Sequence, residues 1–232
     1  IGYGYIGKRL RLSVNAYNTN WGNRFVTRSL SNQQGVDGTA QFRNIDVTHK
    51  GIEAEGTYTF CGTKIRGMLS IGDWTYTKDF EATLFDENQE EIGTGKLYLK
   101  GAKVGDAAQT TALLGIDQKI GSNIRVDLDY RFVDNLYADY SITDSAFTTP
   151  DNDGALKLPS FGLLDLGATF YASNGWSLRG NINNLLDTTY IAESNSNIHA
   201  TADSTTWNGV DTRNSVWFGF GRTWNVSLKY KF

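Results

Sequence analysis

The last eighteen residues alternate between apolar and polar side chains over an unusual length. From Ser215 on, one parity holds Val216, Phe218, Phe220, Arg222, Trp224, Val226, Leu228, Tyr230 and Phe232, and the other is small or polar apart from Trp217. A period of two indicates a β-strand with one apolar face. Soluble strands commonly stop at about 5 to 6 residues, whereas a tilted membrane-crossing strand needs about 9 to 11. The run predicts one very long strand and favours a membrane-spanning sheet.

Other segments repeat this alternation. Between Ile124 and Phe132, apolar residues take one parity and Arg125, Asp127, Asp129 and Arg131 take the other. The segments 10–17, 164–170 and 176–182 are similar. Four charges on one face require water, which either the outer surface of a soluble sandwich or the lumen of a transmembrane barrel supplies. The strands alone leave both open.

Two segments change parity along their length. The apolar positions shift between Val47 and Ile52, and again between Ile71 and Trp74, with Gly51 and Gly72 near the changes. Glycine inside a strand often marks a bulge. We therefore predict bulges at these two places.

The connections between strands fall into two alternating classes. Short turns are expected at residues 6–9, 60–64, 121–123 and 173–175, and long polar stretches near 28–42, 81–107, 141–160 and 191–214. Bacterial outer-membrane barrels have short periplasmic turns and long extracellular loops, whereas a sandwich has no reason to separate the two. We expect about nine antiparallel strands, with the first descending. Since complete barrels have an even count, the chain is expected to be the carboxy-terminal part of a barrel.

Composition agrees with an all-β membrane chain. Aromatic residues make up 13%, and 25 glycines stand against 2 prolines. No run approaches the roughly 20 apolar residues of a spanning helix. A net charge of -3 gives no basic footprint for nucleic acid. The single cysteine, Cys61, forms no internal disulfide, and no cluster has metal-ligand spacing, so no cofactor is predicted. The first residues, IGYGYIGKRL, lack signal-peptide features, so we expect a processed or partial chain.

The final residues, NVSLKYKF, resemble the carboxy-terminal signal by which outer-membrane barrels are recognised for assembly. Asn225 matches its polar position, and Tyr230 and Phe232 match its aromatic positions. Ser227 stands where glycine is usual. The alternative is an ordinary amphipathic strand that ends on phenylalanine.

The segment NINNLLDTTY resembles the penultimate-strand motif of TonB-dependent receptors, in which an Asn-Leu-aliphatic/aromatic-Asp run precedes a tyrosine. Asn184, Leu185, Leu186, Asp187 and Tyr190 take those places. The likeness extends to GFGRTWNVSLKYKF and LKGAKVGDAAQTTA and is greatest to Bacteroidota-type receptors. The plug domain and the TonB box are not seen in residues 1–232.

This resemblance implies a mechanism and a set of partners. A plug would occlude a barrel of 22 strands in the Gram-negative outer membrane, loops would capture a siderophore, corrinoid or oligosaccharide, and the TonB-ExbB-ExbD complex would supply energy. The lipid bilayer, the outer-membrane assembly machinery and a surface lipoprotein would be further partners. Such a protein needs no catalytic group, so no enzyme is predicted. The alternatives are a passive pore, a barrel enzyme or a soluble sandwich.

The remaining site candidates lie in the long stretches. His199, with Asp203 and Ser204 nearby, could form a hydrolase dyad, although polar loop residues are the simpler interpretation. The run 151–154 invites a calcium site but lacks the alternate spacing of a cation loop. Trp207 and His199 are candidate ligand contacts. Several aromatic residues near predicted strand ends suggest membrane girdles, and Trp176 and Tyr230 are expected in the periplasmic one. These residues are found among Trp21, Trp74, Tyr76, Trp176, Trp207, Trp217, Trp224 and Tyr230.

Overall fold

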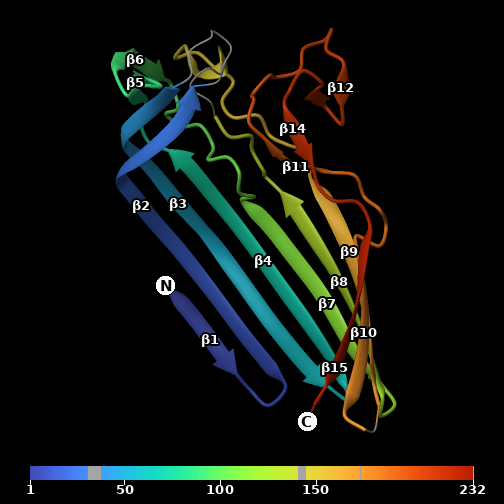
Figure 1. Ribbon diagram of the computed structural model, residues 1–232. Helices are drawn as coiled ribbons and strands as arrows, with labels where there is room; N and C mark the ends of the chain where they lie inside the picture. Colours follow the sequence, from blue (N-terminus) through green and yellow to red (C-terminus); the bar gives the residue numbers. More distant parts are fainter. Residues whose placement is uncertain (31–37, 141–144, 173, 232) are drawn as a thin grey trace.

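The computed structural model describes residues 1–30, 38–140, 145–172 and 174–231. Its main element is an antiparallel sheet of tilted strands (Figure 1). Among the described residues nine strands follow one another in the order β1-β2-β3-β4-β7-β8-β9-β10-β15, which confirms the all-β prediction and the expected count. Their bounds are β1 Gly2–Ile6, β2 Leu10–Leu30, β3 Gly38–Phe60, β4 Thr63–Tyr76, β7 Thr110–Ile120, β8 Ile124–Asp134, β9 Phe161–Tyr171, β10 Trp176–Asn183 and β15 Thr223–Tyr230.

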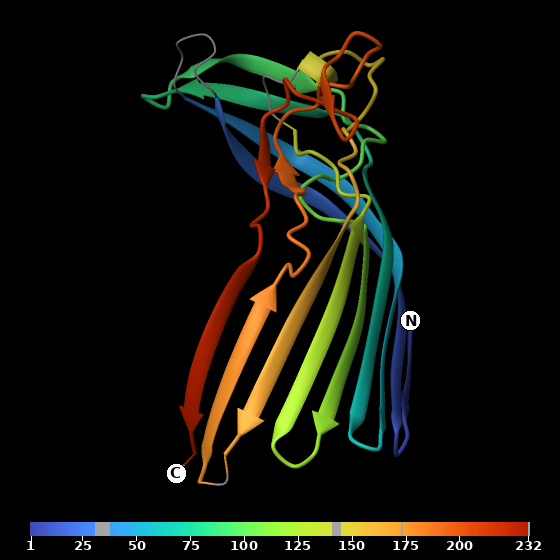
Figure 2. The same ribbon diagram turned by 90° about the vertical axis from the view of Figure 1, so that its right-hand side faces the viewer.

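The sheet is a curved, open wall. Figure 2 shows it bending around from β15 at one edge to β1 at the other, with the short turns together at the lower end. In the described part of the chain, β1 pairs with β2 alone and β15 with β10 alone. No helix among these residues is long and apolar enough to cross a membrane.

The strand register gives the wall two chemically different faces. Leu128 lies beside Ile116 and Leu166, whereas its neighbour Asp127 lies beside Asp117 and Gly167. We call these the apolar face and the polar face. Large exposed side chains on the apolar face include Tyr3, Tyr5, Leu10, Leu12, Ile52, Leu69, Leu114, Leu178, Val226 and Leu228. The predicted division of each strand into two faces is confirmed.

The apolar face stops at a defined level. On β3 it runs from Phe60 up to Ile52 and gives way to Lys50 and Thr48, and on β8 it ends at Asp134. Everything from the short turns up to this level we call the apolar band.

The predicted bulges at Gly51 and Gly72 are wrong. These glycines face each other in a register of β3 with β4 that has no break. The register instead shifts twice between β2 and β3, first with an extra residue on β2 between Trp21 and Arg24 and then with one on β3 between Ile45 and Phe42. There Asn23 and Asn44 take positive φ angles of 56° and 59°, a left-handed conformation that asparagine tolerates better than most residues.

The parity change that suggested those bulges has another cause. Ile45 and Val47 point to the polar side of the wall but are almost fully buried, because other segments cover the wall at that height. Apolar residues therefore change face with their surroundings, and the backbone does not change register with them.

These covering segments form a packed cap at the end that carries the long connections. The predicted polar stretches 28–42, 81–107 and 191–214 contain much strand: β2 and β3 continue to Leu30 and from Gly38, and further elements are β5 Phe80–Asp86, β6 Glu91–Leu97, β11 Ile191–Ser194, β12 Thr206–Trp207 and β13 Val210–Asp211. A short 3₁₀ helix spans Ser145–Phe147. In Figure 1 the β5–β6 hairpin lies above β2 and β3, on the side of the cap away from β14, and β5 pairs with the upper part of β3.

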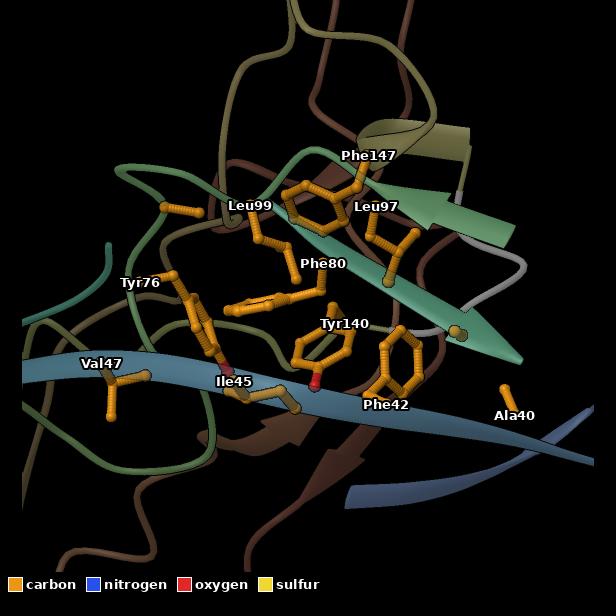
Figure 3. Packing of buried hydrophobic residues seen from close by; sticks show 12 residues of the cluster. Ala40, Phe42, Ile45, Val47, Tyr76, Phe80, Leu97, Leu99, Tyr140 and Phe147 are labelled. Carbon is orange, nitrogen blue, oxygen red and sulfur yellow. The ribbon is translucent and has the colours of Figure 1, made fainter. Parts of the chain in front are cut away.

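Two apolar clusters hold the cap together. In Figure 3 the rings of Phe42, Tyr76, Phe80 and Tyr140 meet edge to face, with Phe147 above them. The second cluster consists of Leu136, Ala138, Leu156, Leu158, Ile191 and Val210. Buried apolar side chains explain why these polar-looking stretches fold.

The long strand predicted from Ser215 to Phe232 is divided. β14, Val216–Phe218, pairs with β11, and β15 starts again at Thr223 and pairs with β10. The break coincides with contacts between the segment 219–222 and the Asn184–Tyr190 motif, described below. Phe232 itself lies outside the described residues.

Candidate functional site

The polar face carries ion pairs that cross an intervening strand. Arg179 on β10 reaches Asp127 on β8 with two hydrogen bonds, Nη1 to Oδ1 at 2.7 Å and Nη2 to Oδ2 at 2.9 Å. Gly167 of β9 is the register partner of Asp127 and lies two residues from Thr169, the register partner of Arg179, so the pair crosses β9 diagonally. A Cβ at Gly167 would overlap both Asp127 Oδ2 and Arg179 Nη2. Only glycine leaves room for this bidentate pair.

A second pair repeats the arrangement. Arg66 on β4 donates to Asp129 on β8 at 2.7 Å, over Gly115 of β7, where a Cβ would overlap Asp129 Oδ1. Arg131 bonds Asp165 at 2.8 Å. Charges at this density need a hydrated surface, so within a barrel the polar face lines the interior and the apolar face meets lipid.

An aromatic row lies on the polar side just above the apolar band. The His49 ring stacks between Trp21 and Trp74, with centroid distances of 5.4 Å and 5.0 Å. Tyr17 crosses over Gly51, and its hydroxyl accepts a 2.9 Å hydrogen bond from Trp74 Nε1. Because the rings stack on one another, they present edges to the interior. The row links β2, β3 and β4 where the wall emerges from the band.

A charged junction joins the cap segments. Arg28 near the top of β2 forms an ion pair with Asp139, and its guanidinium lies 5.1 Å from the centre of the Tyr140 ring. The Asp139 backbone N–H donates to Ser194 O at 2.8 Å, and Asp106 N donates to Tyr137 O at 3.1 Å. Three connections, 77–109, 135–160 and 184–222, therefore meet at one place.

The junction holds more acid than base. Burial, together with the neighbouring carboxylates of Asp139 and Glu193, raises the pKa of Asp106 to about 6, while Arg28 opposes the rise. A side-chain hydrogen bond joins Asp106 and Asp139. A proton shared between two carboxyl groups relieves their repulsion. We therefore expect the contact between cap segments to change at mildly acidic pH.

The motif residue Asn184 lies where β10 leaves the wall. It is buried, with a positive φ of 50°. Its N–H donates to Asp165 Oδ1 at 2.8 Å, its Oδ1 accepts from Thr188 N, and its Nδ2 donates to Thr188 O and to Phe220 O. Leu185 N donates to Leu164 O at 2.6 Å. Asn184 thus connects β9, its own turn and the segment before β15.

Asp187 and Tyr190 extend the same contact. Asp187 Oδ1 accepts the Arg222 N–H at 2.7 Å. Tyr190 stacks on Phe161 at 4.2 Å and lies against Gly219, where a Cβ would overlap its ring. Leu186 is 65% exposed. The motif from Asn184 to Tyr190 therefore binds the segment 219–222 and so positions the last strand.

The predicted assembly residues lie on two faces of β15. Asn225 accepts a 2.8 Å hydrogen bond from Asn181 on the polar face, which Ser227 shares. Tyr230, on the apolar face, packs on Trp176 with centroids 4.7 Å apart. This pair sits beside the short turns, where a periplasmic girdle was expected. Trp21, Trp74 and Tyr76, by contrast, are not girdle residues, because the first two face the polar side and Tyr76 lies in the cap core.

The other loop candidates are engaged within the cap. Trp207 meets Phe218 edge to face and packs on the second apolar cluster. His199 Nε2 lies 3.1 Å from Gly154 O. Ser204 Oγ donates to Asp211 at 2.6 Å, so it is not aimed at His199. In the run 151–154, the Asn152 side chain accepts a hydrogen bond from Gly154 N, which closes a turn. The same side chain donates a hydrogen bond to Tyr98 O. Within the described ranges no three His, Cys, Asp or Glu side chains are grouped to hold a metal.

Sequence reasoning missed the junction and the aromatic row. Both join residues far apart in the chain, such as Arg28 with Asp139 and Trp21 with His49. The sequence offered one signal. Trp21, His49 and Trp74 each alternate in phase with the polar and charged residues of their own strand, which indicates aromatic side chains on the polar face.

The matching family model is the TonB dependent receptor-like beta-barrel, which covers residues 1–185. The chain belongs to this family. Its members are Gram-negative outer-membrane proteins, so the apolar band is the part of the wall that meets the membrane. The match ends within the Asn184–Tyr190 motif. A comparison with curated protein sequences finds no match.

Solved structures of this family share the fold. The chain is similar to the copper transporter OprC, with a TM-score of 0.63 and 16% identity over 100% of this chain and 30% of that one. The siderophore receptor PiuA from Acinetobacter baumannii gives 0.63 and 15% over 98% and 26%. The ferric-catecholate import receptor Fiu from E. coli K12 gives 0.58 and 15% over 98% and 26%. The chain thus spans only 26–30% of the length of these structures.

Proposed function

We propose that residues 1–232 are the carboxy-terminal part of the barrel of an active outer-membrane importer. The plug domain and the TonB box would lie outside this segment, and the complete barrel would have 22 strands. The observation that carries the proposal is the asymmetry of the wall. One end has only tight turns, whereas the other has a packed cap in which the Arg28–Asp139 ion pair ties connections together. A firm rim of this kind suits ligand capture on the outer side.

The imported ligand would be a scarce nutrient of the siderophore, corrinoid or oligosaccharide class. The names of PiuA and OprC, a siderophore receptor and a copper transporter, support a nutrient of this kind. TonB-ExbB-ExbD would pull on the plug, the assembly machinery would hold the strand ending in Tyr230 and Phe232, and a surface lipoprotein could cover the cap. Trp207 and His199, proposed as ligand contacts, would act mainly by fixing the cap. No catalytic role is proposed.

Uptake measurements test this proposal. The full-length receptor would be expressed in paired strains with and without TonB, and accumulation of ferric siderophores, cobalamin and malto-oligosaccharides would be measured at nanomolar supply. We expect concentrative uptake of one ligand in the TonB-containing strain alone. Equal uptake in both strains, proportional to external concentration, would support the alternative of a passive pore.

A further inference from the structure

The register of β2, β3 and β4 places side chains of the apolar face in successive horizontal rows. The row of Ala16, Ile52 and Ile71 is wholly apolar. The next row up is Asn18, Lys50 and Asp73. Two residues along a strand advance about 6.5 Å, so apolar surface changes to charged surface within one step. In a membrane protein this step marks the level of the lipid headgroups.

A groove crosses this step on the apolar face. It has a volume of about 350 Å³ and is lined by Ile52, Ala54, Leu69 and Ile71, with Lys50 and Asp73 at its upper end. Ala54 is the smallest of the four apolar side chains. The groove is therefore a slot that suits a hydrocarbon chain and opens upward onto charged groups.

Two lysines share one carboxylate at the upper end. Lys50 Nζ lies 3.0 Å from Asp73 Oδ2, and Lys103 Nζ lies 2.6 Å from Asp73 Oδ1. Lys103 reaches this level through a bridge to Thr75 at the top of β4. The lysine side chains are 57% and 35% exposed. One carboxylate offsets one ammonium group, so a positive charge remains for an external anion.

We infer that this slot is a binding site for a phosphate-bearing lipid of the outer leaflet. One acyl chain would lie in the slot between Ile52 and Leu69. The phosphate would accept hydrogen bonds from Lys50 and Lys103, which carry ammonium donors suited to it. The site goes beyond the proposed import function, since it is on the outer wall and needs neither plug nor TonB.

Native mass spectrometry of the full-length receptor in detergent tests the site. Lipid A, which carries phosphates, and phosphatidylcholine, which has no net charge, would be added at matched concentration. We expect a retained lipid A adduct and weaker retention of phosphatidylcholine. Removing both ammonium groups in the double variant K50Q/K103Q should lower lipid A retention at least tenfold, because the loss of one charge-assisted hydrogen bond already corresponds to about a factor of ten. The matched control is K229Q/K231Q, which removes Lys229 from the polar face of β15 and Lys231 just after the strand.

A second variant tests the slot itself. Ala54→Trp would fill it and should also lower retention, while Ala168→Trp, on the apolar face of β9, should not. Heat-modifiable gel mobility checks that every variant is folded. Equal retention by the wild type, K50Q/K103Q and Ala54→Trp would overturn the inference, as would full displacement by inorganic phosphate, which has no acyl chain. TonB-dependent uptake, measured in the same variants, should stay unchanged, so failure of the import proposal would be seen separately.

Discussion

At the scale of single residues, the wall uses glycine to let long side chains pass. Tyr17 crosses Gly51, Arg66 crosses Gly115, and Arg179 reaches over Gly167. In each case the glycine is on the middle one of three strands. From sequence, a glycine within a strand indicates either a bulge or a close approach. The sequence predicted a bulge at Gly51, whereas the structure has a close approach. The crossing side chain belongs to another strand and cannot be identified from local sequence.

The crossing at Gly167 leads to a direct prediction. Gly167→Ala should separate Arg179 from Asp127 and destabilise the folded barrel by about 1–3 kcal/mol, the usual cost of overpacking. The measurement is the thermal midpoint of the heat-modifiable barrel band. Gly180→Ala is the matched control on the next strand, because a Cβ there meets nothing within 4 Å. If Gly180→Ala lowered the thermal midpoint as much as Gly167→Ala, the destabilisation would come from losing a glycine and not from separating Arg179 and Asp127.

The junction at Asp106 predicts a pH effect in the cap. The pKa of Asp106 in the folded cap, about 6, is above the ordinary value of 3.8. A raised pKa contributes stability that is present at low pH and is lost as pH rises through about 6. The cap contacts of Asp106 should therefore be firmer at pH 5 than at pH 7.5. Hydrogen exchange of segment 98–109, corrected for intrinsic rates, should show severalfold more protection at pH 5.

Asp106→Asn is the control for this effect. It keeps a hydrogen-bond donor toward Asp139 but cannot ionise, so protection should stay high at both pH values. Glu193 and Arg28 also face Asp106. If the variant retained the full pH dependence, Asp106 would not be its source.

At the scale of strands, the alternation of apolar and polar residues predicted which side chains share a face. It predicted only in part whether apolar side chains meet lipid or lie buried beneath the cap. Within the apolar band, apolar parity and the lipid-facing side coincide, so the strands from β7 to β10 match expectation. Above the band, β3 buries Ile45 and Val47 beneath the cap. The pattern has a period of two in both places. What changes is the covering layer, which is assembled from distant segments and leaves no local signal.

Adjacent residues on β4 test the facing. Leu69 lies on the apolar face one row below the highest apolar row, and Ser70 lies on the polar face beside Glu53. Leu69→Arg should cost about 1–2 kcal/mol because a cation enters hydrocarbon between the midplane and the headgroups, whereas Ser70→Arg should be tolerated in a hydrated interior. The readout is the amount of folded barrel in outer-membrane fractions. Equal losses from both substitutions would contradict the assignment of faces.

At the scale of the whole molecule, the two ends of the wall differ in structure, because one carries short turns and the other carries the packed cap. Strand number, strand facing and the position of short turns follow from periodicity and turn residues, so they were predictable. The cap was predicted as polar loops, because its apolar residues are spread over four connections and gather only on folding. The motif from Asn184 to Tyr190 was recognised by resemblance, and its fastening contacts to Phe220 and Arg222 became visible only in three dimensions.

The orientation of the two ends can be tested with the chain's own cysteine. Cys61 is exposed in the short turn between β3 and β4, so it should face the periplasm, while the exposed cap residues Asp153 and Asp203 should face outward. In intact cells an impermeant maleimide should label Asp153→Cys and Asp203→Cys, each made with Cys61→Ser, and should leave wild-type Cys61 unlabelled. Lysis should make Cys61 reactive, which shows that membrane location and not burial protected it. Labelling of Cys61 in intact cells, with both cap positions protected, would reverse the topology and remove the basis for ligand capture by the cap.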